Sequence, residues 1–169
     1  DSTAPAPQGP SQGSAVFKND VFADKLEVDD NGATSKATFE STLDVESGIT
    51  LTGMNDVTIE FSGSDPQTVS GTINAATTAG GGTINVGASG GTGSDVVFED
   101  ELGTGENIGD VSVNKDSTAQ FNSKIDVDNA ITLKDGATLE TEGNATIDGD
   151  GANNLVVDAG GGTANLVFG

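Results

Sequence analysis

Apolar and polar residues alternate along most of this chain in short runs. In residues 57–61 (VTIEF) the apolar side chains occupy every second position, and residues 111–113 and 125–127 repeat the pattern. A period of two puts alternate side chains on opposite faces of a β-strand. Turn signals rich in Gly, Asn and Asp separate the runs, as in residues 80–82 and 148–151. The chain is therefore predicted to be all-β.

Two all-β architectures fit this pattern. In a β-solenoid, short strands coil into rungs, and each rung buries the face of its neighbour. In a β-sandwich or jelly roll, strands pair antiparallel across two sheets. Small polar turns and an aromatic content of only 4% favour the solenoid. Residues 22–28 and 99–108 lack a full apolar helical face, so we expect loop or strand there too.

The sequence also repeats itself. Residues 37–51 (ATFESTLDVESGITL) match residues 119–133 (AQFNSKIDVDNAITL), and the AGGGT string of residues 79–83 recurs at residues 159–163. Val16-Phe17 resembles Val97-Phe98 at a similar offset. Repetition at a fixed offset is typical of stacked architectures. We therefore expect two tandem copies of one strand-rich unit.

These matches define three expected segments. Residues 1–14 form a leader rich in Pro, Ser, Gly and Gln, which we expect to be flexible. Copy one is expected over residues 15–96 and copy two over residues 97–169. The chain stops at Val167-Phe168-Gly169, where a third copy would begin.

Composition argues against catalysis and against nucleic acid as a partner. The chain has no His, Cys, Trp or Tyr, so the side chains that most readily move protons or attack carbonyls near neutral pH are missing. We expect no enzyme activity. The formal net charge of −21 repels phosphate backbones and anionic lipid. No stretch approaches the roughly 20 apolar residues of a membrane span, so we expect no membrane insertion.

Acidic turns make calcium a possible cofactor. Residues 90–98 (GGTGSDVVF) fit the calcium-binding nonapeptide of parallel β-rolls, in which Asp95 supplies a hard oxygen ligand. Asp126 and Asp128 share a strand face, and Asp148 and Asp150 share a Gly-rich turn. The alternative is a solvated strand face with turn carboxylates capping backbone amides.

Repeat style gives the chain a family resemblance. Phrases such as GTIN at residues 71–74, GTINV at residues 82–86 and SDVVF at residues 94–98 resemble the strand-repeat regions of long bacterial surface proteins. Autotransporter passengers and filamentous-haemagglutinin-like adhesins are the families concerned. The resemblance implies a secreted β-helical protein, extracellular or at the cell surface, that serves adhesion or coat formation.

We therefore predict a structural subunit that binds identical copies head to tail and builds a surface filament or lattice as a homopolymer. Contacts of this kind that do not close give filaments. The alternative is an adhesin or other surface-binding module. A third hypothesis, a lyase-like enzyme with Lys124 or Lys134 among carboxylates, is disfavoured. The residues expected to join subunits are Val16, Phe17, Val21 and Phe22 at one end, and Leu166, Val167 and Phe168 at the other.

Overall fold

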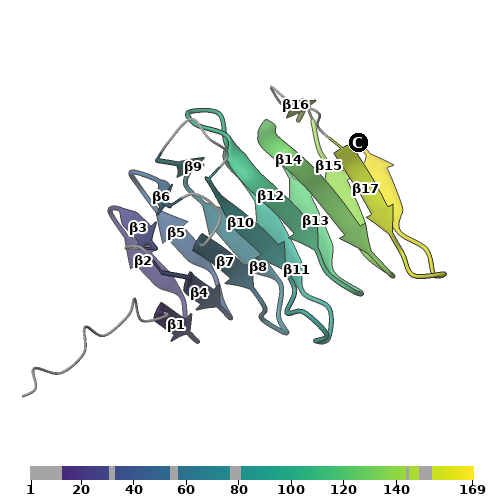
Figure 1. Cartoon of the computed structure of the whole chain (residues 1–169), viewed down its shortest axis with the longest axis horizontal. Coiled ribbons are helices and arrows are strands. Elements are labelled where there is room, and N and C mark those ends of the chain that lie inside the picture. Colours follow the sequence, from purple (N-terminus) through teal and green to yellow (C-terminus); the bar gives the residue numbers. More distant parts are fainter. Residues whose placement is uncertain (1–12, 31–32, 54–56, 77–80, 144, 149–153) are drawn as a thin grey trace, which may run out of the picture.

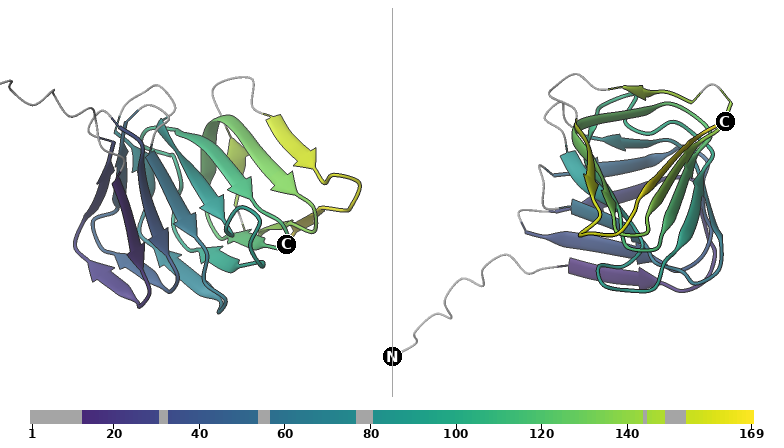
Figure 2. Two further views of the ribbon diagram at one scale, coloured as in Figure 1. Left: turned by 60° about the horizontal axis from the view of Figure 1, so that its bottom comes forward. Right: turned by 90° about the vertical axis from the view of Figure 1, so that its right-hand side faces the viewer.

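The computed structural model describes residues 13–30, 33–53, 57–76, 81–143, 145–148 and 154–169. These residues form a parallel β-solenoid of about six turns without helix. The strands stack along one axis from the N-terminal to the C-terminal end of the chain (Figure 1), and a view along that axis shows the sheets as walls around an interior (Figure 2). The solenoid prediction is confirmed. The sandwich alternative is wrong, because neighbouring strands run parallel and pair residues one turn apart, such as Ser35 with Val57.

Each turn of the chain, here called a rung, passes through three walls in the same order. We name the walls sheet A, sheet B and sheet C. The strands of sheet A, in stacking order, are β1 (Gly13–Phe17), β4 (Ser35–Phe39), β7 (Val57–Phe61), β10 (Gly81–Val86), β12 (Ile108–Val113), β14 (Ile125–Lys134) and β17 (Asn154–Asp158).

Sheet B follows sheet A on every turn. Its strands are β2 (Val21–Ala23), β5 (Leu43–Val45), β8 (Gln67–Ser70), β11 (Asp95–Phe98), β13 (Thr118–Phe121), β15 (Thr138–Thr141) and β18 (Asn165–Phe168). Sheet C contains β3 (Leu26–Asp29), β6 (Ile49–Thr52) and β9 (Ile73–Ala75). Isolated bridges through Leu102 continue it to the first residues of β14, which pair with β16 (Ile147–Asp148).

Alternation along the strands builds the core. In β7 the side chains of Val57, Ile59 and Phe61 turn inward and are fully buried. Buried apolar residues of all three sheets form one continuous cluster, from Val28 near one end to Leu139 near the other. Because each rung buries the inner face of its neighbours, burial is complete only where a rung lies on both sides.

A row of phenylalanine rings runs along the interior. Ring centroids of successive members lie 4.9, 5.8, 5.5 and 4.9 Å apart, and the row consists of Phe17, Phe39, Phe61, Phe98 and Phe121. All these contacts are stacked except the edge-on contact between Phe61 and Phe98. Aromatic pairs at such distances stabilise beyond the area they bury.

Close packing of the turns depends on glycine at particular positions. Gly71 joins β8 to β9 with a φ of 101°, and a Cβ there would lie 2.2 Å from the carbonyl oxygen of Val45 in the rung below. Positive φ is cheap only for glycine. The turn therefore approaches its neighbour closely because no side chain intervenes.

The two segments that were expected to be loop or strand, residues 22–28 and 99–108, contain strands and loops and no helix. Residues 22–28 cover the end of β2, the turn at Asp24 and Lys25, and the start of β3. Within residues 99–108, Leu102 makes the isolated bridges to Ile73 and Ile125. Of the expected leader, Gly13 and Ser14 belong to β1, and residues 1–12 lie outside the described residues.

The two sequence copies occupy different walls of the solenoid. Phe39 ends β4 in sheet A, whereas its counterpart Phe121 ends β13 in sheet B. In sheet A, the register partner of Phe39 three turns later is Val113. Phe121 lies in the next wall of that same turn, so copy two is shifted by one wall relative to copy one. The expected boundary between residues 96 and 97 falls inside β11. The sequence repeat therefore reflects similar individual strands, and its length does not correspond to a whole number of turns.

Candidate functional site

The two ends of the stack present edge strands. At the first end β1 and β2 are terminal in sheets A and B, and at the last end β17 and β18 are terminal. Among the described residues, no further strand pairs with their outer edges. Unpaired backbone groups along an edge strand are a template for another strand.

Side chains of the first rung point both inward and outward. Phe17 and Val21 are half-buried and pack against the core. Val16 and Phe22 occupy the alternate positions on the outer face, where they are 52% and 72% exposed. A hollow of about 270 Å³ opens between β1, β3 and β4, and its lining includes Ala15 and Phe17. The inner face of the first rung is thus partly uncovered.

The last rung exposes apolar side chains as well. Leu166 and Phe168 pair with the buried Leu139 and Thr141, so they continue the inner face of sheet B, yet they are 40% and 70% exposed. Val167 pairs with Glu140 on the outer face. Inward residues remain exposed here because no described rung lies beyond them.

The sequence-based set omitted β17. Its Leu155, Val156 and Val157 are exposed large hydrophobic residues, and they form the sheet A edge of the last rung. This run of three consecutive apolar residues was readable in the sequence. They were missed because the end of the chain was taken as the end of the stack, whereas a three-walled rung ends in more than one strand.

One row of outward positions in sheet A distinguishes the terminal rungs from the inner ones. We call it the outer ladder, and consecutive members are register partners. Its members are Val16, Thr38, Glu60, Asn85, Ser112, Thr132 and Val156. All inner rungs contribute polar side chains, and both terminal rungs contribute valine. Exposed valine is thus confined to the ends of this ladder.

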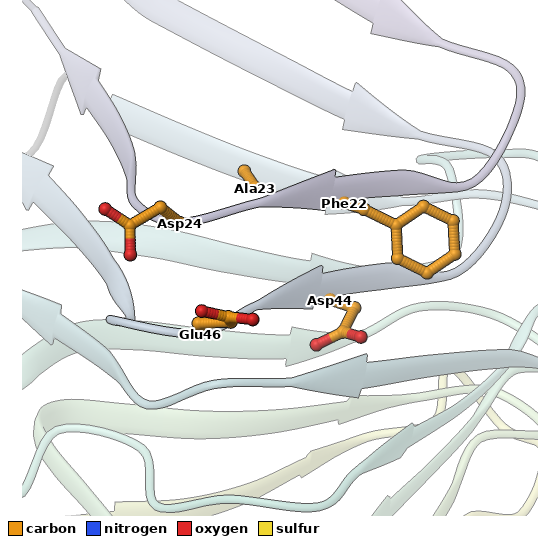
Figure 3. A pocket seen from close by; sticks show the side chains of 5 residues that line it. All are labelled: Phe22, Ala23, Asp24, Asp44 and Glu46. Carbon is orange, nitrogen blue, oxygen red and sulfur yellow. The ribbon is translucent and has the colours of Figure 1, made fainter.

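A second surface feature lies beside Phe22. A hollow of about 330 Å³ is lined by Phe22, Ala23, Asp24, Asp44 and Glu46. Figure 3 shows the ring of Phe22 on β2, the carboxylate of Asp44 on the neighbouring β5 and that of Glu46 just after β5. An exposed aromatic face beside carboxylates suits a ligand with apolar and cationic groups.

Two of the candidate calcium ligands are held together by a lysine. Lys124 Nζ lies 3.2 Å from Asp126 Oδ2 and 3.3 Å from Asp148 Oδ2. Hydrogen bonds to Asp126 and then to Asp148 raise the pKa of Lys124. Asp126 is buried, and its Oδ1 has no hydrogen-bond partner among the described residues. The positive charge between these carboxylates is therefore a side chain of the protein.

The other candidate ligands lie elsewhere. Asp128 accepts a hydrogen bond from Asn107 Nδ2 at 2.8 Å, and Asp95 begins β11 in sheet B, opposite Thr118. Asp150 lies outside the described residues. Within the part of the chain that the structure describes, no group of three or more carboxylates is placed to hold a metal ion. Calcium binding stays a prediction.

Comparisons with models of protein families, with curated proteins and with solved structures found no match. None of the described residues forms a helix long and apolar enough to cross a membrane. The class that the structure defines is the parallel β-solenoid.

Proposed function

We propose that this chain is a secreted structural subunit that joins identical copies end to end and builds a cell-surface filament or lattice. The observation that supports the proposal is the pair of end rungs, whose outer edges pair with no further strand of the described residues. Edge strands of sheets A and B lie at both ends of one stack, and each end exposes apolar side chains. The surface location rests on the resemblance of the strand repeats to bacterial surface proteins. No catalytic role is part of the proposal.

The composition of the end strands favours pairing. Proteins that keep edge strands apart usually place charge or proline on them. β18 (NLVF) has no charged side chain, and the carboxylate of Asp158 in β17 is already paired with Lys134 at 2.6 Å. The first and last rungs are different surfaces, so contact between them is heterologous and gives an open polymer unless the rotation closes.

The net charge of −21 sets a condition on assembly. Acidic side chains lie on all three outer walls, so two subunits repel each other at a distance. At about 0.1 M salt the screening length is about 10 Å, and contact between the end strands β1, β2, β17 and β18, in which Asp158 is the one charged residue, then becomes favourable. Assembly is expected to strengthen as salt rises from low concentration, opposite to the behaviour of a joint held by ion pairs alone.

The test compares two outward-facing valines. Val156→Asp places a carboxylate on the last rung, whereas Val97→Asp places the same group on β11 inside the stack. Sedimentation velocity and negative-stain electron microscopy of the full chain measure assembly. We expect polymers from the wild type and from Val97→Asp, and at least a tenfold higher concentration requirement for Val156→Asp. A wild-type chain that stays monomeric at high concentration and moderate salt would contradict the proposal.

The hollow at Phe22 supports a second candidate function, an adhesin or surface-binding module. The outer position and 72% exposure of Phe22 make it a contact for an external ligand. A screen of glycans and cationic peptides with wild type and Phe22→Ser tests this function. Binding that disappears in Phe22→Ser, from a chain that is monomeric, would favour the adhesin over the filament subunit.

A further inference from the structure

We propose that the joint between subunits has one register, in which β17 of one copy pairs in parallel with β1 of the next and places Val156 beside Val16 and Asp158 beside Lys18. This inference rests on the proposed end-to-end assembly and specifies its contact. The occupant of each open end is a second copy of this chain. Three arguments from ladders of sheet A, each ladder followed from the first rung to the last, select this register.

The outer ladder gives the first argument. It begins at Val16 and ends at Val156, and the inner members between them are polar. If the next copy continues the same ladder, the two exposed valines become direct neighbours across the joint. Each valine then covers the other, and the outer surface on both sides of the joint remains polar.

Charge gives the second argument. The ladder two positions further along the strands joins residues through register pairs and amide-to-carbonyl bonds of consecutive rungs. Its members are Lys18, Glu40, Ser62, Gly87, Asn114, Lys134 and Asp158. Lys18 pairs with Glu40 at 3.4 Å at one end, and Lys134 pairs with Asp158 at 2.6 Å at the other.

Continuing this ladder places Lys18 of the next copy directly after Asp158. The charges across the joint then alternate: Lys134, Asp158, Lys18 of the next copy, and Glu40 of the next copy. Opposite charges on directly neighbouring strands stabilise the pairing, and like charges there destabilise it. The two ends therefore carry complementary charges at the same ladder position.

The inner face gives the third argument. Val157 ends the ladder that begins at Phe17, and Leu155 ends the ladder that begins at Ala15. In the proposed register Val157 covers Phe17 of the next copy, and the larger Leu155 covers the smaller Ala15. A slip of one residue would turn every inward side chain outward. A slip of two residues keeps the faces but moves Asp158 away from Lys18.

Sheet B continues in the same way. The inner ladder that begins at Val21 and Leu43 passes through Val69, Phe98 and Phe121 and ends at Phe168. The next copy therefore brings Val21 onto the exposed ring of Phe168. Sheet C takes no part in this contact, because β16 lies in the rung before β17 and β18. Sheets A and B carry the joint.

Cysteine pairs test the register directly, because the chain contains no cysteine. Chains with Val16→Cys are mixed with chains with Val156→Cys under assembling conditions and oxidised. Neighbouring strands lie about 4.8 Å apart, within the Cα separation that a disulfide accepts. The control replaces Val16→Cys by Ser14→Cys, which lies on the same outer face two residues away. We expect at least tenfold more covalent dimer from the 16–156 pair than from the 14–156 pair.

Other outcomes separate the register from assembly itself. Polymers by sedimentation with equal or greater linkage of the 14–156 pair, or with no linkage of either pair, would overturn the register and leave the proposed function standing. Absence of polymers for the wild-type chain and of linkage for both pairs would overturn both. A second variant, Lys18→Glu, is expected to raise the assembly concentration several-fold at low salt. Lys115→Glu, on the turn between β12 and β13, is the control and is expected to leave it unchanged.

Discussion

Gln67 is a polar residue on the inner face of β8, only 1% exposed. Its Nε2 donates hydrogen bonds to the carbonyl oxygens of Phe39 at 3.0 Å and Ser41 at 2.9 Å, and its Oε1 accepts one from the amide of Gly63 at 2.9 Å. The side chain thus satisfies three backbone groups where the chain turns between sheets A and B. A buried backbone group that loses its partner costs about 1–3 kcal/mol.

We expect Gln67→Leu to lower the free energy of unfolding by about 3 kcal/mol, because the leucine fills the space but makes no hydrogen bond. Urea denaturation followed by circular dichroism measures the change, since the chain lacks Trp and Tyr. Gln120→Leu is the control. Gln120 is half-buried and donates to Asn122 Oδ1, so its replacement should cost less than about 1 kcal/mol. Equal effects at the two positions would show that the three buried hydrogen bonds of Gln67 stabilise the fold no more than the single one of Gln120.

Lys124 gives a pH-dependent prediction. Its hydrogen bonds to Asp126 and Asp148 raise its pKa above the ordinary value of 10.5. Because its pKa is raised in the folded state, Lys124 stabilises the fold at pH values below the pKa that this lysine has in the unfolded chain. This stabilisation is lost as pH rises through the folded-state pKa. We therefore expect wild type to exceed Lys124→Met in stability at pH 7–9 and the difference to shrink above about pH 10.5.

Chemical denaturation across this pH range checks the Lys124 prediction. Lys115→Met removes the same charge from an exposed turn and is the control for the change in net charge. A difference between wild type and Lys124→Met that stays constant up to pH 12 would contradict the proposed link between the lysine and its two carboxylates.

At the scale of strands, the phenylalanine row predicts a gradient of stability. Phe61 contacts rings on both sides, at 5.8 and 5.5 Å, whereas Phe17 contacts one ring at 4.9 Å on the first rung. We expect Phe61→Ala to cost about 3–5 kcal/mol, the usual cost of a buried phenylalanine. Phe17→Ala should cost about 1–2 kcal/mol, because its site is half open to water. Urea denaturation measures both values. Similar losses of unfolding free energy in the two variants would show that the contribution of a phenylalanine does not depend on its place in the row.

Strand positions were largely predictable from the sequence, because inward and outward residues differ in polarity. The alternation of Val57, Ile59 and Phe61 alone predicts β7 and its inner face. The wall to which each strand belongs was not predictable. Turns of different length separate the strands, so an offset in sequence does not fix an offset in space. Phe39 and Phe121 match in sequence and lie in different sheets for this reason.

The candidate site was predictable in part for a related reason. Edge positions follow from chain order, and the structure has Phe17 and Val21 on the first described rung and Leu166 and Phe168 on the last. Their role in joining subunits stays a prediction. Whether an edge residue points inward depends on register with its neighbour, which the sequence does not supply. The pairing of Asp126 and Asp148 through Lys124 likewise depends on which strands stack, and local acidic patterns alone suggested a metal there.

At the scale of the whole molecule, stability passes from rung to rung. Each rung contacts only the rungs beside it, so the inner ones have two neighbours and the terminal ones have one. The cost of leaving an end open is therefore local. It falls on the exposed side chains of the first and last rungs, and a second copy placed on the end removes it. Assembly of this kind should change protection at the ends and leave the middle unaltered.

The amide of Lys18 reports on this change. In the ladder that contains Lys18, the amides of the next three members donate to carbonyls of the preceding rung: Glu40 to Phe17 at 2.8 Å, Ser62 to Phe39 at 3.0 Å, and Gly87 to Phe61 at 2.7 Å. Lys18 stands first in this ladder, so no earlier rung among the described residues offers it a carbonyl. In the proposed polymer, the carbonyl of Val157 from the preceding copy would take that place.

We therefore expect hydrogen exchange of the Lys18 amide to slow at least tenfold when the chain assembles, because exchange then requires the joint to open. The Ser62 amide, inside the stack, should exchange slowly in both states and is the internal control. Exchange measured by mass spectrometry with residue-level fragmentation, on monomer and on polymer, gives both values. Slower exchange at Ser62 alone would mean that assembly stiffens the middle of the solenoid. Unchanged exchange at Lys18 in a polymer would mean that subunits meet through their walls and leave the ends open.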